Sequence, residues 1–182
     1  MRCSEQAPAV AELGVVRPLP RTFFFQNKLN HKHTLKQMAR VSTFLYFPRS
    51  TEAAFLFYKS VFGTEFSRSF MRFNDIPPQP GQPPLDAADK NLIMHVELPI
   101  LGGHLLMGID APESMDHTVT RGNNVVISLE PDTRAETDRL FTALSADGKI
   151  EKALSEMFWG AYFGTCVDRF GIHWMFNCVS KS

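Results

Sequence analysis

The chain has 182 residues, of which 44% are hydrophobic and 12% aromatic, and this composition predicts a folded domain rather than a disordered or fibrous chain. Nineteen basic and nineteen acidic side chains cancel, which argues against a nucleic-acid-binding surface or an anionic membrane partner. No apolar run approaches the roughly 20 residues that cross a bilayer, and three cysteines without CxxC spacing argue against a disulfide framework, so we expect a cytoplasmic protein.

Residues 1–37 differ from the rest of the chain. They hold six Lys or Arg residues against two Glu, they show no sustained period of 2 or 3.6, and three prolines interrupt them. We expect either a disordered arm or an extension of gene-model or cloning origin, with Met38 as the functional start. The domain itself is predicted over residues 38–182.

The first copy of a repeated pattern runs over about residues 41–110. Apolar residues recur every three or four positions over Thr51–Phe62, which predicts an amphipathic helix. Ser50 or Thr51 is the expected N-terminal cap of this helix, and Gly63 is its expected end. Four strands are predicted around it, over Ser42–Phe47, Glu65–Phe73, Asn91–Leu98 and His104–Ile109, the last two joined at Gly102-Gly103.

The same pattern returns over about residues 123–179. Asp132 or Thr133 is the expected cap of a second helix, which stops near Gly148. The expected strands are Asn124–Leu129, Lys149–Phe158, Ala161–Val167 and Ile172–Cys178. A four-residue turn before the last strand would place Cys166 opposite His173, so no Cys166–Cys178 disulfide is expected. The order of elements predicts an α+β protein with two βαβββ modules.

Five short segments together resemble one superfamily. They read Phe47-Pro48-Arg49-Ser50-Thr51-Glu52-Ala53, Ile93-Met94-His95-Val96-Glu97-Leu98, Met157-Phe158-Trp159-Gly160-Ala161-Tyr162-Phe163-Gly164, Asp168-Arg169-Phe170-Gly171 and Trp174-Met175-Phe176-Asn177-Cys178. With the repeated βαβββ plan, they resemble the glyoxalase, bleomycin-resistance and dioxygenase (vicinal oxygen chelate) superfamily, and within it the PhnB-like branch. The resemblance covers Val41 to Cys178.

The resemblance implies that the two modules form a cupped mixed sheet around a pocket, with the helices on the convex face, and that the protein is a homodimer. Superfamily members with enzymatic activity hold one divalent metal through four side chains, which align here with Thr43, Met107, Asn124 and Met175, within about one residue. Two neutral oxygens and two thioethers make a poor site for zinc, nickel or iron. No metal or other cofactor is therefore predicted, although a shift of one residue would bring His104 or His173 toward the site.

His95 and Glu97 share one face of the predicted strand Asn91–Leu98, since side chains two residues apart point the same way. On the side that faces the pocket they are candidates for a general base and its orienting partner, or for a grip on a polar ligand. The alternative is that both simply form hydrogen bonds across the sheet.

Two further residues are candidates for ligand contact. His173 shares a strand face with Met175 and therefore points where a ligand of the second module would lie, and Trp159 supplies stacking area beside a glycine at a strand entry. The alternative for such aromatic and methionine side chains is an ordinary core.

We expect a small-molecule-binding protein with a metal-poor pocket for an organic ligand. The competing hypothesis is a lyase-type or dioxygenase-type enzyme of the same superfamily, either metal-dependent or using acid-base chemistry at His95. A third is a structural or regulatory partner protein whose pocket is vestigial. Branch members are often labelled by likeness to demethylubiquinone methyltransferases, but the sequence has no glycine-rich methyl-donor loop, so that activity is not carried over.

Overall fold

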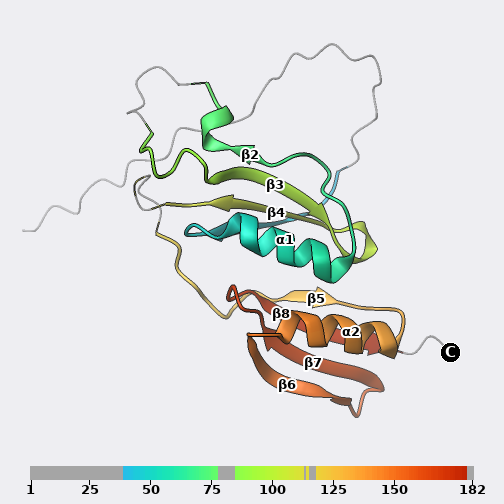
Figure 1. The fold of residues 1–182 in the computed structure, drawn as a ribbon. Helices are drawn as coiled ribbons and strands as arrows, with labels where there is room; N and C mark the ends of the chain where they lie inside the picture. Colours follow the sequence, from blue (N-terminus) through green and yellow to red (C-terminus); the bar gives the residue numbers. More distant parts are fainter. Residues whose placement is uncertain (1–38, 78–84, 113, 115–117, 180–182) are drawn as a thin grey trace, which may run out of the picture. The chain divides into compact units, whose positions relative to one another are not determined.

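A computed structural model describes residues 39–77, 85–112, 114 and 118–179, so the predicted arm over residues 1–37 lies outside the described part of the chain. The described residues form two four-stranded mixed sheets, each with one helix packed against it (Figure 1). None of the helices in these ranges combines the length and the apolar character needed to cross a bilayer.

The first sheet has the strand order β1-β4-β3-β2. β1 pairs parallel with β4, whereas β3 pairs antiparallel with both β4 and β2. Its elements are β1 (Thr43–Phe47), α1 (Thr51–Phe62), β2 (Met71–Arg72), β3 (Ile93–Pro99) and β4 (Leu105–Asp110), and the short 3-10 turns Phe73–Asp75 and Leu101–Gly103 complete this module.

The second sheet repeats this plan in the order β5-β8-β7-β6. β5 pairs parallel with β8, and the other neighbours are antiparallel. Its elements are β5 (Ile127–Leu129), α2 (Arg134–Ser145), β6 (Lys149–Glu156), β7 (Ala161–Val167) and β8 (His173–Val179). β6 is an edge strand whose pairing with β7 shifts register at two points.

The helix boundaries follow from local and distant contacts. α1 ends as predicted at Gly63, which adopts the left-handed conformation with φ 65° and donates its amide to the carbonyl of Lys59. Ser50 is the N-cap residue, but its side chain makes no capping bond, and the amide of Thr51 instead donates to Oδ1 of Asp110 at 2.9 Å. In α2 the predicted cap Thr133 does accept a hydrogen bond, from the amide of Glu136 at 3.2 Å.

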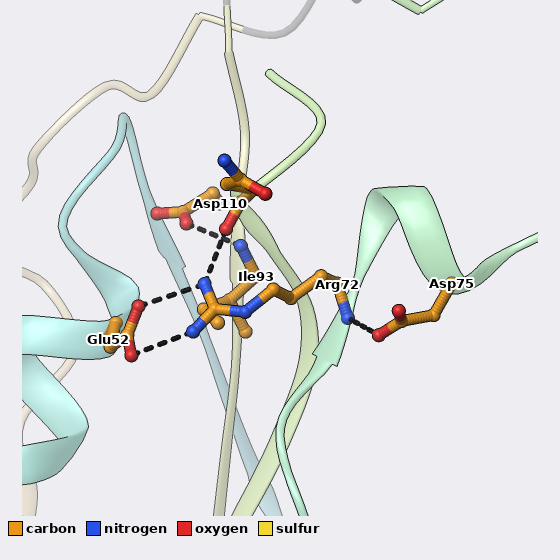
Figure 2. Close-up of polar contacts among 6 residues, drawn as sticks. Glu52, Arg72, Asp75, Ile93 and Asp110 are labelled. Carbon is orange, nitrogen blue, oxygen red and sulfur yellow. Dashed lines mark hydrogen bonds and ion pairs between the residues drawn. The ribbon is translucent and has the colours of Figure 1, made fainter. Parts of the chain in front are cut away.

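Asp110 holds three parts of the first module together. The Thr51 hydroxyl donates to the same Oδ1 at 2.7 Å. The amide of Ile93 donates to Oδ2 at 2.8 Å (Figure 2). The carboxylate is 2% exposed. A buried charge is tolerated where several donors converge on it, so Asp110 at the end of β4 fixes both the start of α1 and the start of β3.

The predicted strand Glu65–Phe73 is wrong, because only Met71 and Arg72 pair with β3. The preceding segment meets β3 through a single bond from the amide of Ser67 to the carbonyl of Glu97, at 3.1 Å. Figure 2 shows what holds β2: both terminal nitrogens of Arg72 reach the Glu52 carboxylate on α1, at 3.0 and 2.8 Å, and the Arg72 amide donates to Asp75.

Two further expectations about the second module are corrected. The first strand covers only Ile127–Leu129, since residues 124–126 precede the ladder. The last turn is one residue longer than predicted, so Cys166 pairs with Trp174 and His173 pairs with Val167. Both Cys166 and Cys178 are free and buried, as expected.

The core lies on the helix-facing sides of the two sheets. Its largest fully buried side chains include Phe55 and Tyr58 of α1 and Trp174 and Phe176 of β8. Gly108 of β4 leaves the space for α1, because a Cβ at this position would overlap the ring of Phe55. Side chains that point away from these helices are therefore the ones available to a ligand.

Candidate functional site

The helix-free face of the first sheet, called the first open face below, carries a cluster of partly exposed apolar side chains. Phe44 and Tyr46 of β1 are 39% and 50% exposed, and Met71 of β2 is 41% exposed. The rings of Phe44 and Tyr46 lie 5.3 Å apart, with a tilted arrangement. The alternation of the strand points them away from Phe47, whose ring meets Phe55 of α1 edge to face.

His95 and Glu97 lie on this face, as predicted from their spacing. Nε2 of His95 lies 3.0 Å from Oε1 of Glu97, and the side chains are 29% and 16% exposed. The His95 ring also lies 6.0 Å from that of Phe44, and Met71 is its partner across the β2–β3 ladder. The pair is therefore an oriented imidazole and carboxylate within an apolar surround, open to solvent on one side.

Thr43 and Met107 do not share a face. Met107 pairs with Phe44 and Glu97, so it belongs to the first open face. Thr43 is one residue away on β1 and points to the other side, where its Oγ1 lies 2.9 Å from Nε2 of His104. The expected register is thus displaced by one residue on β1, and Phe44 is the residue beside Met107.

Asn124 does not lie in a strand. It is exposed and precedes β5, and the residue that pairs with Met175 is Ser128. Met175 itself lies on the helix-free face of the second sheet, since its neighbours Trp174 and Phe176 are fully buried on the opposite face.

His173 and Trp159 both belong to the second sheet. Nδ1 of His173 lies 3.7 Å from Oε2 of Glu151, a neighbour on β6. Trp159 is 47% exposed, and its ring meets Phe163 of β7 edge to face at 5.7 Å. Phe163 pairs with Asn177, which shares the face of His173 and Met175, so Trp159 covers one end of that face.

The side chains at and beside the four positions that align with metal ligands do not fit the divalent metal that the resemblance implies. On β1 and β5, the strands that pair in parallel with β4 and β8, the residues beside Met107 and Met175 are Phe44 and Ser128. Within residues 39–77, 85–112, 114 and 118–179, no three His, Cys, Asp or Glu side chains gather closely enough to hold an ion. The ring, the hydroxyl and the two thioethers at these four positions do not supply the imidazole, carboxylate or thiolate ligands of such sites, and His95 and Glu97 alone are too few to hold an ion.

Sequence analysis missed a buried polar centre at Asp168. Its Oδ2 accepts hydrogen bonds from the Tyr58 hydroxyl and the Trp174 indole, at 2.7 and 2.8 Å, and its Oδ1 accepts from the amides of Phe170 and Ile172. Burial, and then the charge of Asp168, raise the pKa of Tyr58 well above its usual value. Because Asp168 is buried and its two oxygens accept four hydrogen bonds from the chain itself, we interpret this centre as structural.

Two grooves open beside β1. One has a volume of about 430 Å³ and runs between Thr43, the turn at Leu101 and the segment from Val125 to Glu130. The other, of about 220 Å³, follows β1 and reaches Arg121 and the turn before β8. Sequence analysis did not single out Phe44 or Tyr46, because Thr43–Phe47 is almost continuously apolar and shows no alternation. It missed Arg121 because the segment around this residue shows no periodic signal.

The chain matches the family model described as 3-demethylubiquinone-9 3-methyltransferase over residues 39–176. Among curated proteins, YjdN of Escherichia coli (strain K12) is 33% identical over 89 residues, which cover 49% of this chain and 58% of YjdN. The chain therefore aligns with little more than half the length of that relative.

Solved structures extend the likeness over the paired modules. Protein PA1353 from Pseudomonas aeruginosa has a TM-score of 0.68 and 32% identity, over 79% of this chain and 100% of that chain. The PhnB protein from Bacillus cereus has a TM-score of 0.56 and 27% identity, over 78% and 100%. A glyoxalase/bleomycin resistance protein/dioxygenase family enzyme from Burkholderia phytofirmans PsJN, at 21% identity over 75% and 97%, shares the fold with a TM-score of 0.51. The predicted fold class is thereby confirmed.

Proposed function

Since the chain belongs to the PhnB-like family, whose model is described as 3-demethylubiquinone-9 3-methyltransferase, and has the glyoxalase/bleomycin-resistance fold, we propose that it binds a small organic molecule on the first open face. One observation carries the proposal: Phe44, Tyr46 and Met71 remain 39 to 50% exposed around the His95–Glu97 pair. Binding sites commonly combine apolar walls with a few oriented polar groups.

The side chains of this face suit a flat ligand. Two neighbouring aromatic rings offer stacking area, and the flexible thioethers of Met71 and Met107 adapt to different shapes. His95 and Glu97 provide one donor-acceptor pair that orients a polar group of the ligand. The proposal needs no metal, in keeping with the donor set described above.

The test is a fragment screen on the full chain by ligand-observed NMR, followed by titration of the strongest hit. Phe44→Ala and Tyr46→Ala are each expected to raise the Kd by tenfold or more, because each removes stacking surface. Leu56→Ala is the matched control, since Leu56 is an equally exposed apolar residue on α1. Saturable binding without turnover supports the proposal. Turnover stimulated by a divalent metal, or an equal loss in Leu56→Ala, contradicts it.

A second candidate function is acid-base catalysis on a carbonyl-bearing substrate. The observation that favours it is the 3.0 Å contact between His95 and Glu97, because a carboxylate on one ring nitrogen orients the imidazole as a proton acceptor. Once a turnover assay exists, His95→Ala and Glu97→Gln should each lower kcat, by about 100-fold or more for His95. An unchanged rate in His95→Ala rules this mechanism out.

We also propose that the protein is a homodimer, as expected for its family. Light scattering coupled to size-exclusion chromatography of the full chain, at two concentrations tenfold apart, measures the mass directly. A mass of twice 20.6 kDa at both concentrations supports the proposal, and a monomer at both contradicts it.

A further inference from the structure

The smaller of the two grooves has one wall from each module. β1 forms one side, with Phe44 and Tyr46 in its lining, and the turn from Phe170 to His173 forms the other. Its volume is about 220 Å³. A cavity of about 150 Å³ is enough for one benzene ring, so this groove has room for a ring with a short substituent.

Arg121 is placed at this groove by the turn that precedes β8. Its Cδ, Nε and Cζ atoms lie 3.2 to 3.3 Å from where a Cβ on Gly171 would be, so the side chain lies against the backbone of that residue. Gly171 has φ +87°, a conformation that favours glycine, and any larger residue would also push Arg121 away. The side chain therefore lies against the turn, and Arg121 remains exposed to solvent.

Arg121 dominates the charge of this groove. No Asp or Glu is among the described residues that line it, and in the described part of the chain Arg121 has no ion pair or hydrogen bond. His173, the other basic residue of the lining, already faces Glu151 at 3.7 Å. An unpaired guanidinium beside aromatic side chains is a recognition element for an anion, because its planar fork matches a carboxylate.

We propose that this groove binds a small aromatic monocarboxylate, with the carboxylate on the Arg121 guanidinium and the ring against Tyr46 and Phe170. The inference rests on the proposed function and names its ligand class, since Phe44 and Tyr46 belong both to the first open face and to this groove. The ring gains apolar contact on both walls, and the carboxylate replaces water around an otherwise solvated cation.

The test compares phenylacetate with its neutral analogue 2-phenylethanol, by NMR titration of the full chain and of three variants. Arg121→Gln should raise the Kd for phenylacetate tenfold or more, which corresponds to about 1.4 kcal/mol, and leave 2-phenylethanol unchanged. Arg121→Lys keeps the positive charge but removes the planar guanidinium, so it should raise the Kd for phenylacetate by a smaller factor. Arg68→Gln is the matched control, since Arg68 is exposed and does not line the groove, and it should change neither Kd.

The outcomes separate this inference from the proposed function. If both compounds bind equally well to the unchanged protein and to Arg121→Gln, the carboxylate assignment is overturned while small-molecule binding stands. If Arg68→Gln weakens phenylacetate as much as Arg121→Gln does, the effect is one of net charge and the site is overturned. If phenylacetate does not bind while the fragment screen yields other ligands, the ligand class is wrong. If neither the two compounds nor any fragment binds, both proposals fail.

Discussion

The hydroxyl of Tyr58 donates to the Asp168 carboxylate at 2.7 Å and so joins the first helix to the last hairpin across 110 positions of sequence. Both residues are buried, and Trp174 donates to the same oxygen. Because the Tyr58 ring also meets Trp174 at 5.7 Å, polar and aromatic contacts between the two modules coincide at one point. Stability of the domain should therefore depend on this pair.

Tyr58→Phe is expected to lower the free energy of unfolding by about 1.5 to 3 kcal/mol, the usual range for a hydrogen bond to a charged group. Urea denaturation followed by circular dichroism measures the loss. Tyr162→Phe is the matched control, since Tyr162 donates to Asp138 at 2.9 Å at an exposed position, and its loss should stay within about 0.5 kcal/mol. Equal losses in the two variants would contradict the assigned role of burial.

The pKa of Tyr58, raised by burial and by Asp168, predicts a specific loss of stability at alkaline pH. Tyrosine in the unfolded chain ionises near about pH 10, whereas folded Tyr58 keeps its proton to higher pH. The contribution is therefore complete below about pH 10 and is lost as the pH rises toward the folded pKa. Urea denaturation between about pH 8 and pH 11 should show a steeper decline for the unchanged protein than for Tyr58→Phe. Parallel curves would contradict the shift.

Asp110→Ala is expected to destabilise the protein by about 2 to 4 kcal/mol, because it leaves the amides of Thr51 and Ile93 without their acceptor. Asp75→Ala is the matched control from the same region (Figure 2), since Asp75 accepts one bond, from the exposed amide of Arg72. Hydrogen exchange at Ala54 and Phe55 should rise in Asp110→Ala alone. Unchanged exchange there would show that α1 starts without this cap.

Gly108→Ala is expected to cost about 1 to 3 kcal/mol through overpacking, because the added methyl group overlaps the Phe55 ring. Phe55→Leu creates room at the same place, so the double variant should be more stable than the sum of the two single losses predicts. Thermal denaturation of the unchanged protein, the two single variants and the double variant measures this difference. Strict additivity would mean that the two residues do not meet.

Metal content is predicted to be low, since the four positions where ligands would be needed offer a ring, a hydroxyl and two thioethers. Elemental mass spectrometry of untagged protein, purified without chelator, should find well under one divalent ion per chain. Added zinc or nickel should move the Tm by less than about 1 °C, because only an ion that binds the folded state raises it. One tightly bound ion per chain, with a Tm that follows its concentration, would contradict the donor assignment.

The sequence was most informative where structure depends on neighbouring residues. α1 and its end at Gly63 follow from a local apolar period and one glycine, and Ala161–Val167 has the predicted bounds. The cap of α1 could not be predicted, because its acceptor Asp110 lies 59 positions away. Glu65–Phe73 has the composition of a strand, yet Phe66 and Phe70 pack on each other at 4.8 Å instead of joining the ladder.

The candidate site was predicted in part. His95 and Glu97 follow from spacing alone, since residues two apart in any strand share a face. Predicting Phe44 requires the register of its strand, which a run of apolar residues does not determine. A register error of one residue selects a side chain on the opposite face of the sheet, as happened with Thr43. Arg121 depends on the turn at Gly171, in a segment whose sequence shows no periodic signal.

The two register shifts in β6 have a consequence for self-association. A long edge strand offers unpaired amides and carbonyls to any other chain, which makes it a site of uncontrolled aggregation. In β6 the shifts flank Lys152, and Lys149, Glu151 and Glu156 add charge along the same eight residues. Because of the irregular spacing and the charge, another strand cannot form a continuous ladder with β6, so we expect this edge to resist strand addition.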